Sequence, residues 1–254
     1  MDFIAILIAS FISLIISIFS VSVGGTSLIT VPLLISLGMS SKTAVATNMF
    51  ALIFLSLSGA AGLKKASKIT QFKWFAFLSV LTVGGSFLGA NIILTIDQDV
   101  LRKVISAMIC IMACLFLFKK NLGIQERKEQ ISNKRLVVGS LLIFILGIYG
   151  GFFSGGYVTL LSFVLLLIFN LNFLQVVFAT KVLNIFSSSA AFIFFCIHGL
   201  VDFSVGIPMA CSMSLGALIG AKLAIKKGNP WIRNVFLLAV AVLALKLLFF
   251  DKTN

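Results

Sequence analysis

A short stretch of the second half of the chain combines an ammonium, a hydroxyl and an amide: Lys181, Thr180 and Asn184. Lys181 is the only acidic or basic residue between Arg135 and His198, where the sequence is otherwise apolar. A cation at the centre of a bilayer costs at least ~2.5 kcal/mol, and such residues generally mark functional sites. The stretch therefore predicts an anion site. The alternative is that the long side chain carries its charge to the membrane interface.

This stretch, "VFATKVL", has a counterpart in the first half, "AVATNMF", which contains Thr47 and Asn48. Serines continue the polar character along both segments. A single serine in a helix commonly bonds to the preceding turn, so none of them alone predicts a site. As a group beside the lysine they are candidates for lining a cavity. They are Ser56, Ser58, Ser187, Ser188 and Ser189, of which Ser188 is included in the predicted site.

Two adjacent glycines in each half predict a break in a membrane helix. In hydrocarbon, unpaired backbone groups cost several kcal/mol, so such a break must be buried in protein or line a cavity. The helix that starts after the break offers N–H groups and the positive end of its dipole to an anion. The predicted binding residues at the breaks are Gly24, Gly25, Thr26 and Ser27 in the first half, and Gly155 and Gly156 in the second.

Glycines in membrane helices also permit close packing without any ligand. For the two glycine pairs at the breaks, packing and binding both stay open. Four further glycines, spaced four residues apart within each pair, favour packing: Gly85 and Gly89, and Gly216 and Gly220.

The composition predicts an all-α, polytopic membrane protein. Hydrophobic residues make up 60% of the 254 residues, and 39 consecutive residues, 3–41, carry no charge. Uncharged runs longer than about 18 residues indicate transmembrane helices. The net charge of +13 comes from short basic clusters between apolar runs, which indicates membrane topology and anionic lipid as the partner rather than nucleic acid.

Similar segments recur at an offset of 131 residues, which predicts two homologous halves, residues 1–118 and 136–254, joined by a basic cytoplasmic linker, 119–135. Lys and Arg gather in the loop 64–73 of the first half and in 222–233 of the second. If these clusters and the linker share the cytoplasmic side, the halves are inverted repeats and both termini face out. The run 3–41 is too long for one span and is expected to cross twice, the second pass being short or broken. The expected total is eight to ten spans.

The segments "GGTSLITVPLLISLGMSSKTAVATNMFAL" and "GGYVTLLSFVLLLIFNLNFLQVVFATKVLNIFSSSAAFIF" resemble the two signature regions of the TauE/SafE sulfite exporter family, also called the toluene sulfonate uptake permease group. The resemblance covers nearly the whole chain. It implies a multi-pass transporter of the plasma membrane that moves sulfite, sulfonates or related organosulfur anions. The chain departs from the family pattern in having two consecutive glycines where three are common, and Phe163 where the first copy has Pro32.

The predicted function is transport of a small sulfur-containing anion through a midplane site between the halves, without enzyme activity. No carboxylate lies within a predicted span, and cation or metal sites prefer carboxylates, so neither a metal nor a cofactor is expected. An anion channel would share the same lining. A different alternative is a rhomboid-like intramembrane serine protease with Ser154 as the nucleophile and His198 as the base, although "GGFFSGG" does not fit its motif. Exact substrate, direction, coupling ion and oligomeric state are not predicted.

Overall fold

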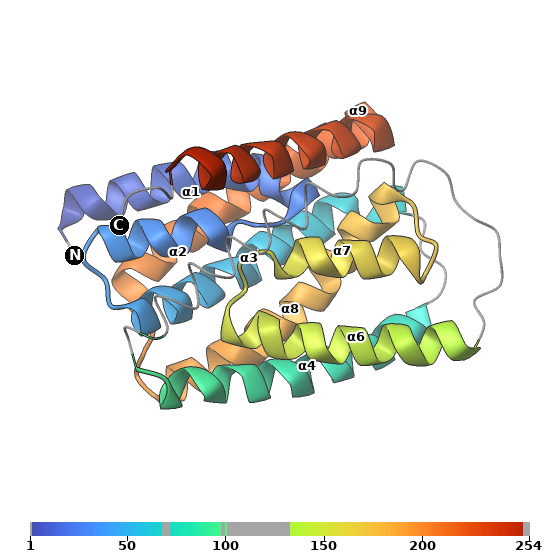
Figure 1. The fold of residues 1–254 in the computed structure, drawn as a ribbon. Coiled ribbons are helices and arrows are strands. Elements are labelled where there is room, and N and C mark those ends of the chain that lie inside the picture. Colours follow the sequence, from blue (N-terminus) through green and yellow to red (C-terminus); the bar gives the residue numbers. More distant parts are fainter. Residues whose placement is uncertain (1, 68–71, 98–99, 101–132, 251–254) are drawn as a thin grey trace.

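The computed structural model describes the chain except residues 1, 68–71, 98–99, 101–132 and 251–254, so most of the predicted linker lies outside the described residues. All regular secondary structure in the described part is α-helical. The helices are α1 (Phe3–Val23), α2 (Ser27–Ser36), α3 (Ser41–Ser67), α4 (Phe72–Thr95), α6 (Asn133–Phe152), α7 (Tyr157–Leu167), α8 (Phe173–Ile197) and α9 (Phe203–Phe250) (Figure 1).

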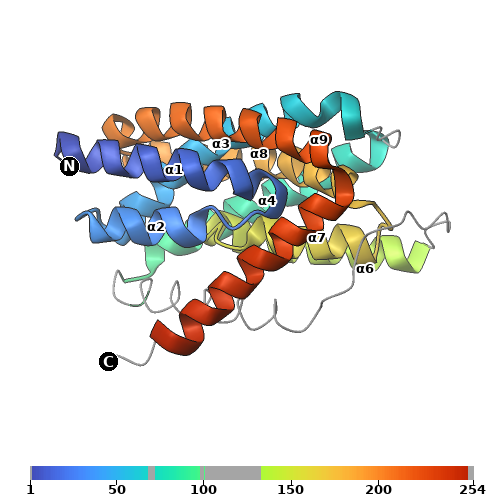
Figure 2. The ribbon, with the colours of Figure 1, turned by 90° about the horizontal axis from the view of Figure 1, so that it is seen from above.

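Six of the described helices are long and apolar enough to cross a membrane: α1, α3, α4, α6, α8 and the first part of α9, up to Gly228. At Gly228 the backbone leaves helical geometry, and the rest of α9 runs obliquely across the other helices in Figure 2. These spans confirm the predicted all-α membrane fold. The total of eight to ten spans stays a prediction, because residues 101–132 are not described.

The uncharged segment 3–41 folds as two helices, with the second short, as predicted. α1 has 21 residues, and α2 has only 10. At 1.5 Å per residue α2 is about 15 Å long, half of what a bilayer requires. α2 ends where Gly38 takes a φ of 94° and the Met39 N–H donates to the Leu34 carbonyl, which satisfies a carbonyl of its last turn.

Corresponding helices of the two halves run in opposite directions. α1 starts at the end of the bundle marked N in Figure 1, whereas α6 starts at the other end. α3 and α8 are likewise antiparallel, since Phe50 contacts Phe192 near one end and Asn184 bonds Ser56 further along. This is the geometry that inverted repeats require. The common origin of the halves and their orientation in a membrane stay predictions.

The glycine stripes pack helices together, as predicted. α4 lies against α6, and α9 lies against α1. A Cβ atom on any of these glycines would overlap backbone atoms of the facing helix. The close approaches are Gly85 to Phe144, Gly89 to Ile148, Gly216 to Leu14 and Gly220 to Ile18, so each half uses its stripe in the same way.

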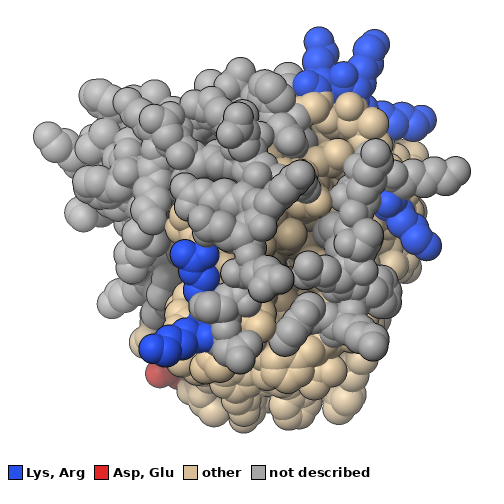
Figure 3. All heavy atoms as spheres, turned by 90° about the vertical axis from the view of Figure 1, so that its right-hand side faces the viewer, with Lys and Arg blue, Asp and Glu red and all other residues tan. Residues whose placement is uncertain are grey.

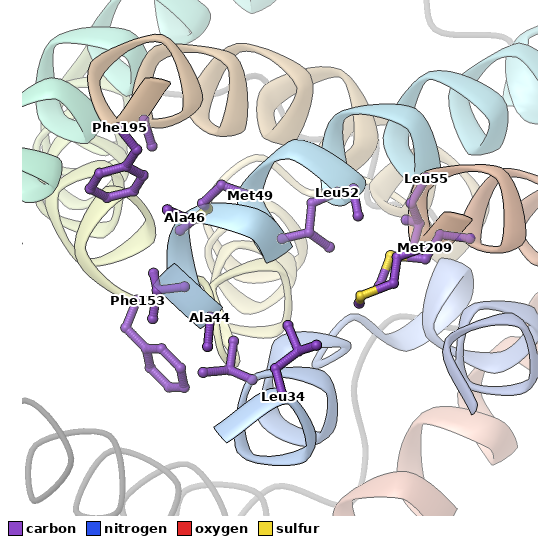
Figure 4. Packing of buried hydrophobic residues seen from close by; sticks show 14 of the residues in the cluster. Leu34, Ala44, Ala46, Met49, Leu52, Leu55, Phe153, Phe195 and Met209 are labelled. Atoms are coloured by element: carbon purple, nitrogen blue, oxygen red, sulfur yellow. The ribbon is translucent and has the colours of Figure 1, made fainter. Parts of the chain in front are cut away.

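The apolar core surrounds α3, which lies inside the bundle (Figure 4). In this view Ala44 lies near Leu34 of α2 and Phe153 after α6, and Leu55 lies next to Met209 of α9. The side chains labelled in Figure 4 are Leu34, Ala44, Ala46, Met49, Leu52, Leu55, Phe153, Phe195 and Met209, and all of them are buried.

Basic side chains gather at one end of the bundle, which Figure 3 shows from outside. α3 ends there, α6 begins there and α9 bends there. The exposed basic residues at this end are Lys64, Lys134, Arg135, Lys222, Lys226 and Lys227. Their common location agrees with the charge-based prediction that the clusters of both halves share one side. That this side is the cytoplasm stays a prediction.

Candidate functional site

The two breaks meet inside the bundle. Gly24 has φ 82° and ψ −163°, a conformation that is essentially restricted to glycine. A Cβ at Gly24 would lie 2.8 Å from the Cβ of Val158, in the first turn of α7. In the reverse sense, a Cβ at Gly155 would lie 2.9 Å from Leu28, in the first turn of α2. The glycines therefore allow the starts of α2 and α7 to touch (Figure 1).

In each break, a side-chain hydroxyl bonds to a residue six positions away in the sequence, across the break. In the first, the Thr26 hydroxyl donates to the Ser20 hydroxyl at 2.7 Å. In the second, the Tyr149 hydroxyl donates to the Gly155 carbonyl. Gly156 then takes the left-handed φ of 81° and caps α7. These bonds tie the end of one helix to the start of the next, so the two helix N-termini converge in fixed orientations.

A chain of buried hydroxyl and amide groups crosses the junction. Ser27 donates to the Ser154 hydroxyl at 3.3 Å, which links the two halves. The Asn48 amide donates to Ser27 at 2.8 Å, and the Thr30 hydroxyl donates to the Asn48 carbonyl oxygen at 2.7 Å. All four side chains are at most 5% exposed. The structure thus brings the predicted residues Ser27 and Asn48 together with Ser154 and Thr30.

Lys181 lies beside this junction and is only 1% exposed. Its ammonium donates to the main-chain carbonyl of Ser20 at 3.3 Å, and the N–H of Gly24 donates to the same oxygen at 2.7 Å. Its methylenes run past Gly59 on α3, where a Cβ would lie 3.5 Å from the Lys181 Cγ. The structure excludes the alternative that this lysine extends to the membrane interface, because its charge is buried next to the first break.

Polar side chains continue from Lys181 along one face of α8, since residues three and four apart share a face. Asn184 donates to the Ser56 hydroxyl at 2.7 Å, and Ser188 donates to the Asn184 side-chain oxygen at 3.4 Å. Ser187 bonds the hydroxyl of Ser86 on α4 at 2.5 Å. Asn184 and Ser188 are therefore in the same polar group as Lys181.

Two predicted site residues point elsewhere. The Thr47 hydroxyl accepts a hydrogen bond at 3.0 Å from the N–H of Asp202, just before α9. The Thr180 hydroxyl donates to the Val177 carbonyl in its own helix at 2.9 Å. Both are buried, and both hydroxyls are used in holding the fold.

Sequence reasoning missed several residues of this site: Ser20, Thr30, Ser86 and Tyr149. Thr30 is three residues after Ser27 and thus on the same face of α2, a spacing that would have found it. Ser20 and Tyr149 lie in the helices before the breaks, where no motif indicates that the chain turns back toward them.

The protease alternative lacks its geometry. The Ser154 hydroxyl lies at the break and accepts from Ser27. His198 follows the end of α8, where its Nδ1 pairs with the Phe194 carbonyl. It is 17 residues beyond Lys181 on α8, or about 25 Å along the helix axis at 1.5 Å per residue. Ser154 and His198 are thus not a nucleophile and its base.

The buried polar side chains of the described residues are hydroxyls, amides and the ammonium of Lys181, with no buried carboxylate among them. Over the same residues, no cluster of three or more His, Cys, Asp or Glu side chains offers a metal site. The junction thus presents one positive charge, two helix N-termini and neutral hydrogen-bonding groups.

Comparison with known proteins agrees with the sequence and the fold. The model of the sulfite exporter TauE/SafE family matches residues 9–247. The chain belongs to this family. TauE/SafE membership over nearly the whole chain accounts for both signature segments, and it makes the protein a multi-pass membrane transporter. Together with the six candidate spans, it supports the predicted location in the plasma membrane.

Curated relatives carry transporter names, which indicate a transporter rather than an enzyme. A probable membrane transporter protein of Haemophilus influenzae is 31% identical over 227 residues, covering 89% of this chain and 88% of that protein. Escherichia coli YfcA, also a probable membrane transporter protein, is 30% identical over 89% of this chain and 83% of its own. Bacillus subtilis YdhB, with the same description, is 26% identical over 90% and 94%. No solved structure matches the chain.

Proposed function

We propose that this TauE/SafE transporter carries a small sulfur-containing anion, such as sulfite or an organosulfonate, through the junction of the two breaks. The observation that carries this proposal is the buried ammonium of Lys181 beside two converging helix starts. The family description, sulfite exporter, supports the sulfur chemistry of the substrate. Sites at the interface of inverted repeats near the membrane midplane are common among secondary transporters.

The charge of Lys181 favours an anionic substrate. An ammonium has three N–H donors, and the described residues give it one acceptor, the neutral Ser20 carbonyl. Burying a charge without a partner of opposite sign is unfavourable. An oxyanion beside Lys181 would supply the missing charge and the missing acceptors. Since no buried acidic side chain competes for the lysine, the substrate is its natural partner.

The backbone and hydroxyl groups complete the proposed site. The first N–H groups of a helix have no acceptor within that helix, and they point toward its N-terminus. Several of those of α2 and α7, such as the N–H of Leu28 and of Tyr157, already donate to carbonyls just before each helix. The positive ends of the two helix dipoles nevertheless converge at the junction, where Gly24 and Gly155 keep side chains out of the way. Ser27 and Ser154 add hydroxyls that can turn toward a ligand, because a hydroxyl both donates and accepts.

Uptake into liposomes containing the purified protein tests this proposal. We expect saturable uptake of sulfite or of a sulfonate, accelerated by the same anion preloaded inside, as a carrier requires. The Lys181→Gln variant should lose this uptake at normal protein density. Lys222→Gln, which removes an exposed lysine of the basic end, is the matched control and should retain it.

Two outcomes would count against the proposal. Uptake by Lys181→Gln at the normal rate would remove the lysine from the mechanism. Flux that neither saturates nor responds to preloading would indicate a channel with the same lining. A thermal-shift screen of the purified protein with sulfite, sulfate, thiosulfate, taurine and sulfoacetate would identify which anion stabilises it.

A further inference from the structure

We infer that the junction selects its ligand by net charge. It accepts singly charged anions and discriminates against doubly charged anions of the same shape. This inference rests on the proposed function, because it assumes that an anion binds beside Lys181. It adds a selection rule that follows from how many charges the two halves bury there, and under this rule sulfite would bind as the monoanion hydrogensulfite.

The buried part of the site contains a single full charge. Position by position, the duplicated motif places Asn48 in the first half where the second half has Lys181. Both side chains are 1% exposed and both reach the breaks. Asn48, however, is neutral and is already engaged with Ser27 and Thr30. One half of the site therefore supplies an ammonium and the other half supplies an amide.

The other basic residues do not add to this count. Lys42 donates to the Leu94 carbonyl where α3 begins, whereas Lys181 faces Gly59, far along the same helix. Lys64 and Lys222 are exposed at the basic end. Water and salt screen exposed charges strongly, with a Debye length of ≈ 8 Å at physiological ionic strength. No charge of either sign in the described interior accompanies Lys181.

Charge balance then selects the ligand. A monoanion beside Lys181 leaves the buried pair neutral, whereas a dianion leaves one uncompensated negative charge. The cost of moving an ion out of water rises with the square of its charge, so a dianion also loses far more hydration. The remaining groups at the junction are dipoles, which oppose this loss only in part.

The test compares two ligands of one shape, methanesulfonate and methylphosphonate, in binding to the purified protein. Both have a methyl group and three oxygens on a tetrahedral centre. Methanesulfonate is a monoanion throughout, while methylphosphonate changes from monoanion to dianion between mildly acidic and mildly alkaline pH. We expect the affinity for methylphosphonate, relative to methanesulfonate, to fall at least about tenfold on this change. Methanesulfonate is measured at the same two pH values, and the comparison uses a pH interval over which its own affinity does not change.

Two variants identify the cause. Asn48→Lys gives the first half the second half's charge, and it should shift the preference at alkaline pH toward the dianion. The double variant Asn48→Lys/Lys181→Asn moves the charge without changing its number, and it should keep the wild-type preference. The variants show whether the number of buried charges causes the preference. The wild-type affinity ratio tests the inference by itself if a variant fails to fold.

The outcomes separate the inference from the proposed function. If both ligands bind and the dianion binds as tightly as the monoanion, the inferred selectivity for monoanions is wrong, while the proposed anion site is retained. An unchanged preference for the monoanion in a folded Asn48→Lys variant would also overturn the inferred charge selectivity. If neither these ligands nor any sulfur anion binds, the proposed function and this inference fail together.

Discussion

The break between α1 and α2 and the break between α6 and α7 share a backbone plan but differ in side chains. Both use glycines with positive φ, and both tie the helices across the break with a hydroxyl. After the first break, α2 starts with hydroxyl-bearing residues, Thr26, Ser27 and Thr30. After the second, α7 starts with Tyr157, Val158 and Thr159, and the first two of these side chains pack into an apolar cluster.

This difference shows how two halves with a similar backbone plan can form one asymmetric junction. The backbone dipoles come in two copies, but the ammonium comes only from the second half. It is used on the first half, where Lys181 bonds Ser20. Ser154 likewise bonds Ser27 across the halves. Each break is therefore completed by residues of the other half, and neither half contains the site alone.

If the two halves are inverted repeats, the two breaks enter the membrane from opposite sides. Cysteine labelling gives an all-or-none test of this arrangement. His198 and Lys226 are exposed at opposite ends of the bundle. In a background without native cysteines, we expect His198→Cys to react with an impermeant maleimide added outside intact cells. Lys226→Cys should react only after the cells are opened. The reverse pattern for either residue would overturn the predicted orientation.

The contact between the breaks can be disrupted by a methyl group at Gly24. Gly24→Ala forces an alanine into a glycine-only conformation and pushes its Cβ against Val158, at a combined cost of about 2–5 kcal/mol. Gly38→Ala is the matched control, because its φ is 94° and no atom lies within 4 Å of its Cβ. The control should cost about 1–2 kcal/mol. Melting temperatures in detergent measure both, and equal losses would mean that the breaks do not press together.

Equivalent positions on α3 and α8 should separate binding from stability. Lys181→Gln should weaken substrate affinity by about 10–100-fold, since hydrogen bonds to charged groups contribute about 1.5–3 kcal/mol. Its melting temperature should equal or exceed that of the wild type, because a buried charge with a neutral partner is removed. Asn48→Ala should instead lower the melting temperature, as it leaves Ser27 and Thr30 without their amide partner.

Transport kinetics and unfolding of the same two preparations check this separation. A Lys181→Gln protein that is much less stable than the wild type would show that the lysine holds the fold. An Asn48→Ala protein with unchanged stability would show that the amide contributes little to the junction.

The features of the site that could be predicted from sequence are those that the membrane imposes. A lysine in an apolar run and paired glycines in a long uncharged segment are unfavourable in lipid, so both indicate a protected interior. The structure places Lys181 there and brings the glycine pairs together. The direction of the two halves followed from charge, because Lys and Arg concentrate on one side.

Side-chain direction within a motif was harder to predict. Thr47 and Asn48 are neighbours in sequence, but successive residues on a helix do not face the same way. Only Asn48 faces the break, while Thr47 bonds Asp202. Thr180 and Lys181 differ in the same manner. Tyr149 was missed because its bond to Gly155 depends on how the chain turns after α6, which no local pattern specifies.

The smallest effect is expected from removing the hydroxyl that bonds across each break, that of Tyr149 or that of Thr26. Tyr149→Phe removes one oxygen and leaves the Gly155 carbonyl without that donor, whereas Thr26→Val leaves the Ser20 hydroxyl free to turn to another partner. We expect Tyr149→Phe to cost about 1 kcal/mol and Thr26→Val less, as read from melting temperatures in detergent. Because Tyr149 fixes the start of α7, its loss should also weaken substrate binding, whereas a purely structural tie would change stability alone. If Thr26→Val instead loses more stability and more substrate affinity than Tyr149→Phe, the hydrogen bond across the first break is the more important of the two.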